Sequence, residues 1–207
     1  MVLRSVRLVR AALVAALVAA LATPVLAAPT VNTRLGDTRV TLSPQFTGAL
    51  QSLQVNVSTV FPTRLRSGVV DFPIPAGEID LQSLKGEIVH DGGLNLRAGN
   101  TTVTLSSFVI DTTGGAPVLT GLVKANDSVV GRLPLFDIAL NRAPSVREGG
   151  AIDILSIDNV GLTLNAEAAA ALNGAFNVNA FAAGIPIGTA RVHTPVFDPD
   201  RVFQRKN

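Results

Sequence analysis

The sequence has no cysteine, no tyrosine and no tryptophan, and it has two histidines and one methionine. Without cysteine the chain forms no disulfide, has no thiol nucleophile, builds no cysteine-ligated metal site and carries no lipid-modified cysteine. Its stability must therefore come from the packing of apolar side chains. The two histidines, His90 and His193, are the remaining candidates for general-base chemistry or ligand binding.

The motifs of common enzyme classes are also missing. The chain contains no Gly-x-Ser-x-Gly elbow, no histidine pair at metal-ligand spacing and no glycine-rich loop leading from a strand into a helix. We therefore expect a protein that is not an enzyme and holds no metal. A hydrolase of an unrecognised class stays open as an alternative, because a triad can be assembled from residues in any order along the chain. Its base would have to be His90 or His193.

Residues 1–27 have the features of a secretory signal peptide. Three arginines precede an apolar run over residues 11–22, and small residues precede a cleavage position after Ala27. The run is shorter than the roughly 20 apolar residues that cross a membrane. This pattern predicts Sec-type export from a bacterium, with no transmembrane segment in the secreted, extracellular product.

Loss of this segment reverses the sign of the net charge. The whole chain has 17 basic and 15 acidic residues, for a formal charge of +2. Removing the three N-terminal arginines leaves 14 of the 17 basic residues against 15 acidic ones. We therefore expect no nucleic acid as a partner. The expected partner is an extracellular ligand or a component of the cell envelope, which the sequence does not name, and the oligomeric state stays open.

The mature sequence is dominated by short alternating segments that are typical of β-strands. Residues 87–90 and 94–97 flank Asp91-Gly92-Gly93, which predicts a hairpin turn, and further turns are expected at Gly99-Asn100 and Asn126-Asp127. Eight or more strands with two short helices predict an all-β fold, an antiparallel β-sandwich. An α+β fold with one large sheet is the alternative. We expect a single domain over residues 28–195 and a polar, flexible tail over residues 196–207.

Two segments 122 residues apart predict short helices by the same pattern of strand, cap and apolar face. Ser43 and Pro44 suit the N-cap and the first position of one helix. Asn165 suits the N-cap of a second helix over residues 166–173, which Gly174 is expected to end. A further helical turn is expected over residues 180–183. The matching offsets indicate matching roles, with the two helices closing opposite ends of the sandwich.

His90 is the candidate binding residue. It shares strand parity with Ile88, so its ring is expected on the buried face beside the predicted turn. Two interpretations stay open. The ring either bonds backbone groups of the turn, which is the commoner arrangement, or lies in a pocket and contacts a ligand. His193 shares the parity of Arg191 and is expected to be exposed.

The segment Gly86-Glu87-Ile88-Val89-His90-Asp91-Gly92-Gly93-Leu94 resembles the strand-His-x-Gly segment of HtaA-type domains. The segment Leu162–Ala169, followed by Phe181–Gly184, resembles the closing segment of the same domains. The resemblance covers residues 86–188. It implies an exported, β-rich domain of the kind that actinobacteria use in haem uptake.

In that family a tyrosine ligates the haem iron and a histidine supports the tyrosine. His90 matches the supporting histidine, but the chain has no tyrosine, and Phe181 stands where the closing segment often has one. The ligand role is therefore not carried over, and His90 or His193 would have to hold any haem. The resemblance implies a secreted, non-catalytic binding or envelope-associated module without a cofactor. The alternative is a carrier of haem or of another hydrophobic small molecule, with its pocket near His90.

Overall fold

The computed structural model describes residues 30–148 and 152–197. The predicted signal peptide and the tail beyond Phe197 lie outside the described residues. The helices are α1 (Pro44–Ser52) and α2 (Ala166–Phe176). The strands are β1 (Thr30–Thr33), β2 (Gly36–Leu42), β3 (Asn56–Val60), β4 (Arg64–Arg66), β5 (Val69–Ile74), β6 (Ala76–Asp80), β7 (Gly86–Ala98), β8 (Thr101–Asp111), β9 (Val118–Ala125), β10 (Ser128–Leu140), β11 (Ser145–Arg147), β12 (Asp153–Leu164) and β13 (Pro186–Phe197). The last strand therefore runs two residues past the predicted end of the domain.

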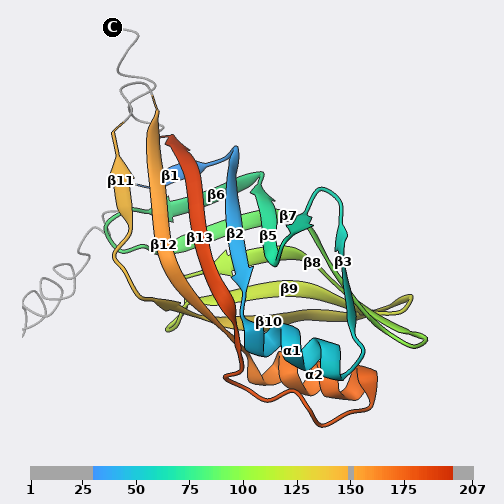
Figure 1. Ribbon diagram of the computed structural model, residues 1–207. Coiled ribbons are helices and arrows are strands. Elements are labelled where there is room, and N and C mark those ends of the chain that lie inside the picture. The colour runs from blue at the N-terminus through green and yellow to red at the C-terminus, as the bar shows by residue number, and fades with distance from the viewer. Residues whose placement is uncertain (1–29, 149–151, 198–207) are drawn as a thin grey trace, which may run out of the picture.

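The strands form one antiparallel sheet in the order β11-β12-β10-β9-β8-β7-β6-β1-β13-β2-β5-β4, with β3 attached to β7. Because β12 also pairs with β13, the sheet returns on itself. Figure 1 shows two layers, in which β2, β5, β12 and β13 cross steeply in front of β7 to β10. The predicted all-β fold, an antiparallel sandwich with two short helices, is confirmed, and its two layers belong to one continuous sheet.

The prediction of a hairpin turn at Asp91-Gly92-Gly93 is wrong. Both of its predicted strands belong to β7, and both pair with β8 across a bulge between His90 and Gly93. A bulge bends a strand without ending it. Gly92 has a φ of +84°, and a Cβ there would lie 2.2 Å from the hydroxyl oxygen of Thr63. Glycine is therefore required at this bend, and it turns the strand beside His90 instead of reversing the chain.

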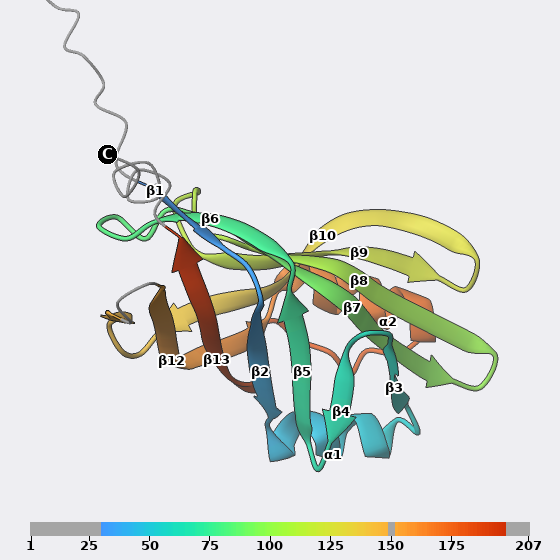
Figure 2. The same ribbon diagram turned by 90° about the horizontal axis from the view of Figure 1, so that it is seen from above.

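The other two predicted turns are confirmed. Gly99-Asn100 joins β7 to β8, and Asn126-Asp127 joins β9 to β10. The tips of the two hairpins are bonded to each other, since Thr102 N donates to Asn126 Oδ1 at 2.9 Å and Asn126 N donates to Thr102 O at 2.7 Å. Figure 2 shows the two hairpins extending together past the layer of β2, β5, β12 and β13.

Both helices begin at the predicted caps. The hydroxyl oxygen of Ser43 accepts a hydrogen bond from Phe46 N at 3.0 Å, and Pro44 occupies the first helical position. The side-chain oxygen of Asn165 accepts from Glu167 N at 2.9 Å. Each cap satisfies a backbone donor that the first helical turn leaves without a partner.

The end of α2 differs from the prediction. Gly174 lies inside the helix, which continues to Phe176. Asn177 takes the left-handed C-cap conformation with a φ of 53°, a role that asparagine can fill in place of glycine. Residues 180–183 form no helical turn. Neither helix in the described part of the chain is long and apolar enough to cross a membrane.

The helices lie at the same end of the sandwich, so the expectation of opposite ends is wrong. Strands β2 and β12 flank β13, and Gly188 of β13 is the register partner of both Leu42 and Leu162. The two strands that lead into the helices therefore run in the same direction, and α1 and α2 begin at the same end of the strands (Figure 1).

Alternate residues of the strands fill the space between the layers. Phe72 of β5 and Phe108 of β8 meet edge to face, with their ring centroids 5.2 Å apart. The largest fully buried apolar side chains come from strands of both layers: Ile74, Ile88, Leu135, Leu155, Leu164 and Ile187. Packing between the layers thus supplies the core that the cysteine-free composition requires.

Candidate functional site

The two layers leave an apolar cavity of about 100 Å³ between them. It is lined by 32 residues that come from both layers and both helices. Among these residues, which all belong to the described part of the chain, none is Asp, Glu, Lys or Arg. The polar side chains of the wall are those of Thr38, His90 and Thr112. The cavity therefore has an apolar wall with three polar side chains.

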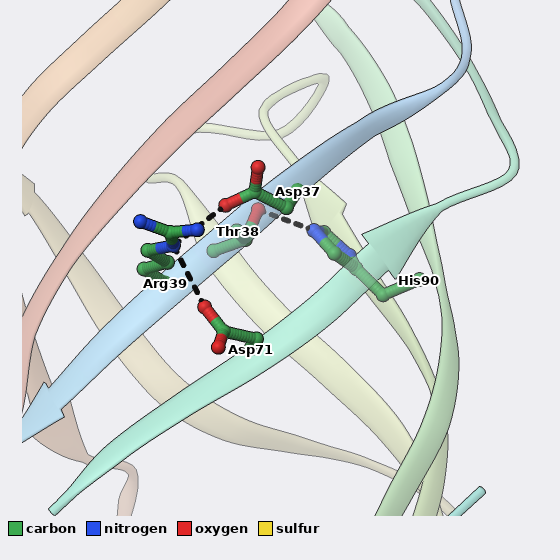
Figure 3. A network of polar contacts seen from close by, with 5 residues as sticks. All are labelled: Asp37, Thr38, Arg39, Asp71 and His90. Atoms are coloured by element: carbon green, nitrogen blue, oxygen red, sulfur yellow. Dashed lines mark hydrogen bonds and ion pairs between the residues drawn. The ribbon is translucent and has the colours of Figure 1, made fainter. Parts of the chain in front are cut away.

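His90 is one of these three side chains, and its burial follows from strand parity. As predicted, it lies on the same face of β7 as Ile88, and both are 2% exposed. Its Nε2 lies 2.7 Å from the hydroxyl oxygen of Thr38 on β2, as Figure 3 shows. Thr38 is itself 4% exposed. The partner of Nε2 is therefore a side chain of the opposite layer, and backbone groups of Phe108 and Ile88 lie close enough to the ring to act on its pKa.

The second ring nitrogen of His90 is not satisfied. Nδ1 is buried and has no hydrogen-bond partner among the described residues. Burial lowers the pKa of the His90 imidazolium from 6.5 to about 4, and the neighbouring backbone groups of Phe108 and Ile88 partly oppose the shift. The ring is thus neutral at physiological pH. Nε2 is bonded to Thr38, and Nδ1 lies near backbone groups of Phe108 and Ile88 without a hydrogen bond of good geometry.

One part of the cavity wall reaches the protein surface. We call Leu84, Thr112, Pro117, Leu140 and Pro144 the mouth, because these lining residues are partly or largely exposed. They stand at neighbouring ends of β7, β8, β9 and β10, which the register holds side by side. Leu140 is 43% exposed.

The only polar side chain of the mouth is already bonded. The hydroxyl of Thr112 donates to the carbonyl oxygens of Leu84 at 2.5 Å and of Gly86 at 3.1 Å. Lys85 stands beside the mouth, and its ammonium group donates to the carbonyl oxygens of Thr113 and Gly114. The mouth therefore presents apolar side chains and an ammonium group whose hydrogen bonds go to a loop.

Charged residues lie on the outer face of the same strand that carries Thr38. Arg39 Nε lies 2.8 Å from an oxygen of Asp71 on β5 and 3.2 Å from one of Asp37 (Figure 3). Residues alternate in direction along β2, so Thr38 faces the cavity while its two neighbours face solvent. These half-exposed ion pairs help to fix β2 against β5 and contribute no charge to the cavity.

The two histidines do not converge. His193 is exposed, as predicted, and lies on the outer face of β13, where its register partner is Asp37. Phe181 is 4% exposed but does not line the cavity, and its backbone is bonded on both sides by Asn173. In the described part of the chain no three His, Asp or Glu residues form a group that could hold a metal.

The sequence identified His90 but not Thr38, its partner. Thr38 lies 52 residues before His90 in the sequence, and no local pattern connects the two residues. The parity of Thr38 with Val40, which is also buried, is the one signal that places its hydroxyl on the inner face.

A second apolar cavity, of about 220 Å³, lies between α2 and the strands β8 to β10. It shares a wall with the first cavity, since Leu105, Phe136, Leu164 and Leu172 line both. Small residues of α2, among them Ala168, leave this space open.

No protein-family model matches the sequence, and no curated protein matches it. Solved structures do match the fold. The C-terminal domain of HtaA from Corynebacterium glutamicum superposes with a TM-score of 0.59 at 11% identity, covering 81% of this chain and 99% of that one. The N-terminal domain of the same protein gives a TM-score of 0.56 at 15% identity, covering 78% of this chain and 97% of that one. This chain therefore has the fold of an HtaA-type domain, as the resemblance in its sequence implies.

Proposed function

We propose that this chain is an exported, non-catalytic binding module that takes a small apolar molecule into the cavity between its layers. The observation that carries the proposal is the apolar cavity whose wall holds a buried histidine with one free ring nitrogen. The partly exposed mouth supplies a route of entry from solvent.

The presence of the cavity supports a ligand more than it supports stability. Protein interiors are normally packed to high density, with few voids larger than a water molecule. An empty apolar space costs stability, at about 24 cal/mol for each Å³ in measured cases. The same cost applies to the second cavity, but of the two only the first, of about 100 Å³, has polar side chains in its wall that a ligand could bond.

The polar groups at the cavity favour binding over catalysis. A hydroxyl and an imidazole at 2.7 Å resemble a nucleophile and its base. A working triad also needs a third group that orients the imidazole, and Nδ1 of His90 has no partner among the described residues. A hydrolase therefore draws little support from this pair.

The predicted signal peptide supports a location outside the cytoplasm, either secreted or associated with the cell envelope. The shared fold of the HtaA domains is consistent with that location. The chain has no cysteine, so it has no thiol that the oxidising conditions outside the cytoplasm could alter.

Binding of 1,6-diphenylhexatriene, an uncharged, narrow, rod-shaped dye whose fluorescence rises in apolar surroundings, tests the proposal. We expect saturable binding to the full chain purified after export. Ala190→Leu should reduce it strongly, because Ala190 lines the cavity and three added carbons fill much of its volume. Ala168→Leu is the matched control, since Ala168 lines the second cavity instead. No saturable binding, or loss only in Ala168→Leu, would refute the proposal.

A further inference from the structure

We infer that the cavity takes an uncharged molecule with a flexible apolar chain and a single hydrogen-bonding group, and that it does not take haem. The inference rests on the proposed function and adds the chemical class of the ligand. It follows from the charge, the hydrogen bonding and the shape of the cavity.

The charge of the wall excludes an ionised group inside the cavity. None of the 32 lining residues is charged, and the neutral ring of His90 offers no cation to a carboxylate. Burying an ionised carboxylate without a partner costs several kcal/mol. Lys85 stands outside the lining and is exposed, so its ammonium charge lies at the surface and not in the cavity wall. A ligand with a carboxylate therefore has no counter-charge in the wall, and the two propionates of haem have none either.

The hydrogen bonds of the wall leave one position for a ligand. The hydroxyls of Thr38 and Thr112 are both bonded within the protein. Of the buried side-chain atoms without a partner in the described residues, Nδ1 of His90 is the one that belongs to the lining. A neutral imidazole nitrogen forms one hydrogen bond, as donor or as acceptor according to its tautomer. One hydroxyl or carbonyl group on the ligand would satisfy it.

The shape of the cavity favours a chain over a flat ring system. The lining extends from Phe46 and Leu172 of the two helices to Pro144 at the mouth, yet the volume is about 100 Å³. The space is therefore long and narrow. Pockets for drug-sized molecules usually measure about 300–1,000 Å³. A flexible chain can enter by small rotations of the lining side chains, whereas a rigid macrocycle needs the two layers to separate.

The residues also fail to offer a ligand to a haem iron. The chain contains no tyrosine or cysteine, and its one methionine lies in the predicted signal peptide. Nε2 of His90 is engaged by Thr38, and His193 is on the outer face. Nδ1 of His90 lies in the wall of a cavity of about 100 Å³, which is too small for the macrocycle to bring its iron to that nitrogen. The shared fold with HtaA domains therefore does not bring a haem site with it.

Displacement of 1,6-diphenylhexatriene by 1-decanol and by decanoate at pH 7.5 tests the class, because the two compounds share one chain length and differ in charge. We expect decanol to bind at least tenfold more tightly than decanoate. Haemin should give no saturable change in its Soret band. His90→Leu should weaken decanol about tenfold, as expected for one lost hydrogen bond to a buried group, and leave decane unchanged.

The outcomes separate this inference from the proposed function. Decanoate or haemin binding as tightly as decanol, with Ala190→Leu still blocking the dye, would overturn the ligand class and leave the proposed function standing. Equal effects of His90→Leu on decane and decanol would overturn the hydrogen-bonding role of His90. A protein that does not bind the dye at all would overturn both.

Discussion

Acidification from pH 8 to pH 5 should destabilise this protein through a single buried side chain, His90. Its pKa is lowered from 6.5 to about 4 in the folded state, because burial penalises the charged ring. Between these two values the unfolded chain binds a proton that the folded chain does not. The stability from neutral His90 is therefore fully present above pH 6.5 and is lost as the pH falls towards 4.

The magnitude follows from the two pKa values. At roughly 1.4 kcal/mol for each pKa unit, the full loss is about 3 kcal/mol, of which about 2 kcal/mol has occurred by pH 5. Little of this is screened by solvent, since His90 is 2% exposed. A loss of that size is a large share of the roughly 5–15 kcal/mol that holds a typical domain folded.

The two carboxylates with lowered pKa values contribute little in this range of pH. Backbone N–H groups of Ser83 and Gln82 lower the pKa of Asp80. The hydroxyl of Thr113 lowers the pKa of Asp111. By the same linkage, the stability from these two groups is present at pH 5 and is lost only at more acidic pH, below their ordinary range. The interval from pH 8 to pH 5 therefore keeps the effect of these two carboxylates out of the measurement.

Urea unfolding followed by far-ultraviolet circular dichroism at pH 8 and pH 5 measures the effect; without tryptophan or tyrosine, the usual fluorescence signal is absent. His90→Leu should remove most of the pH dependence. His193→Leu is the matched control at an exposed ring and should retain the loss of about 2 kcal/mol. An equal pH dependence in wild type and His90→Leu would refute the reasoning.

Four further substitutions test the contacts and local structures described above. Thr38→Val should lower the free energy of unfolding by about 1–3 kcal/mol, because it leaves Nε2 of His90 unbonded. The double variant with His90→Leu should lose less than the sum of the two single losses. A double-mutant cycle in urea that is additive within about 0.5 kcal/mol would contradict this. Gly92→Ala should lower the free energy of unfolding by more than about 2 kcal/mol, because of the positive φ of Gly92 and its close contact with Thr63. Gly174→Ala, in an open helical position, should raise it by up to about 1 kcal/mol. A higher melting temperature for Gly92→Ala than for Gly174→Ala would contradict the bulge. Ser43→Ala should lower the free energy of unfolding by about 1 kcal/mol through the lost cap, and an unchanged urea midpoint would show that the cap is not needed.

Features that depend on neighbouring residues were predictable from the sequence. The caps at Ser43 and Asn165, the turn at Asn126-Asp127 and the inward direction of His90 each follow from a short pattern whose physical cause is local. The same holds for the all-β class, because alternating apolar residues fit a strand with one buried face.

Features that depend on pairing were not predictable. Asp91-Gly92-Gly93 has the composition of a hairpin turn, but a glycine with positive φ serves a bulge equally well, and the choice depends on whether the flanking segments pair with each other or with a third strand. The two helices share one sequence pattern, yet their position at the same end follows from the shared partner β13.

The sequence by itself determined which chemistry this protein lacks and which face of each strand is apolar. Composition excludes thiols, phenols and disulfides, and parity directs His90 inward, because both depend on residue type and local geometry. The tertiary structure alone decided what His90 meets. Thr38 reaches it from a strand 52 residues away in the other layer, and one ring nitrogen stays unbonded in an uncharged cavity. Those contacts arise from the way one sheet folds over on itself, which no local pattern specifies.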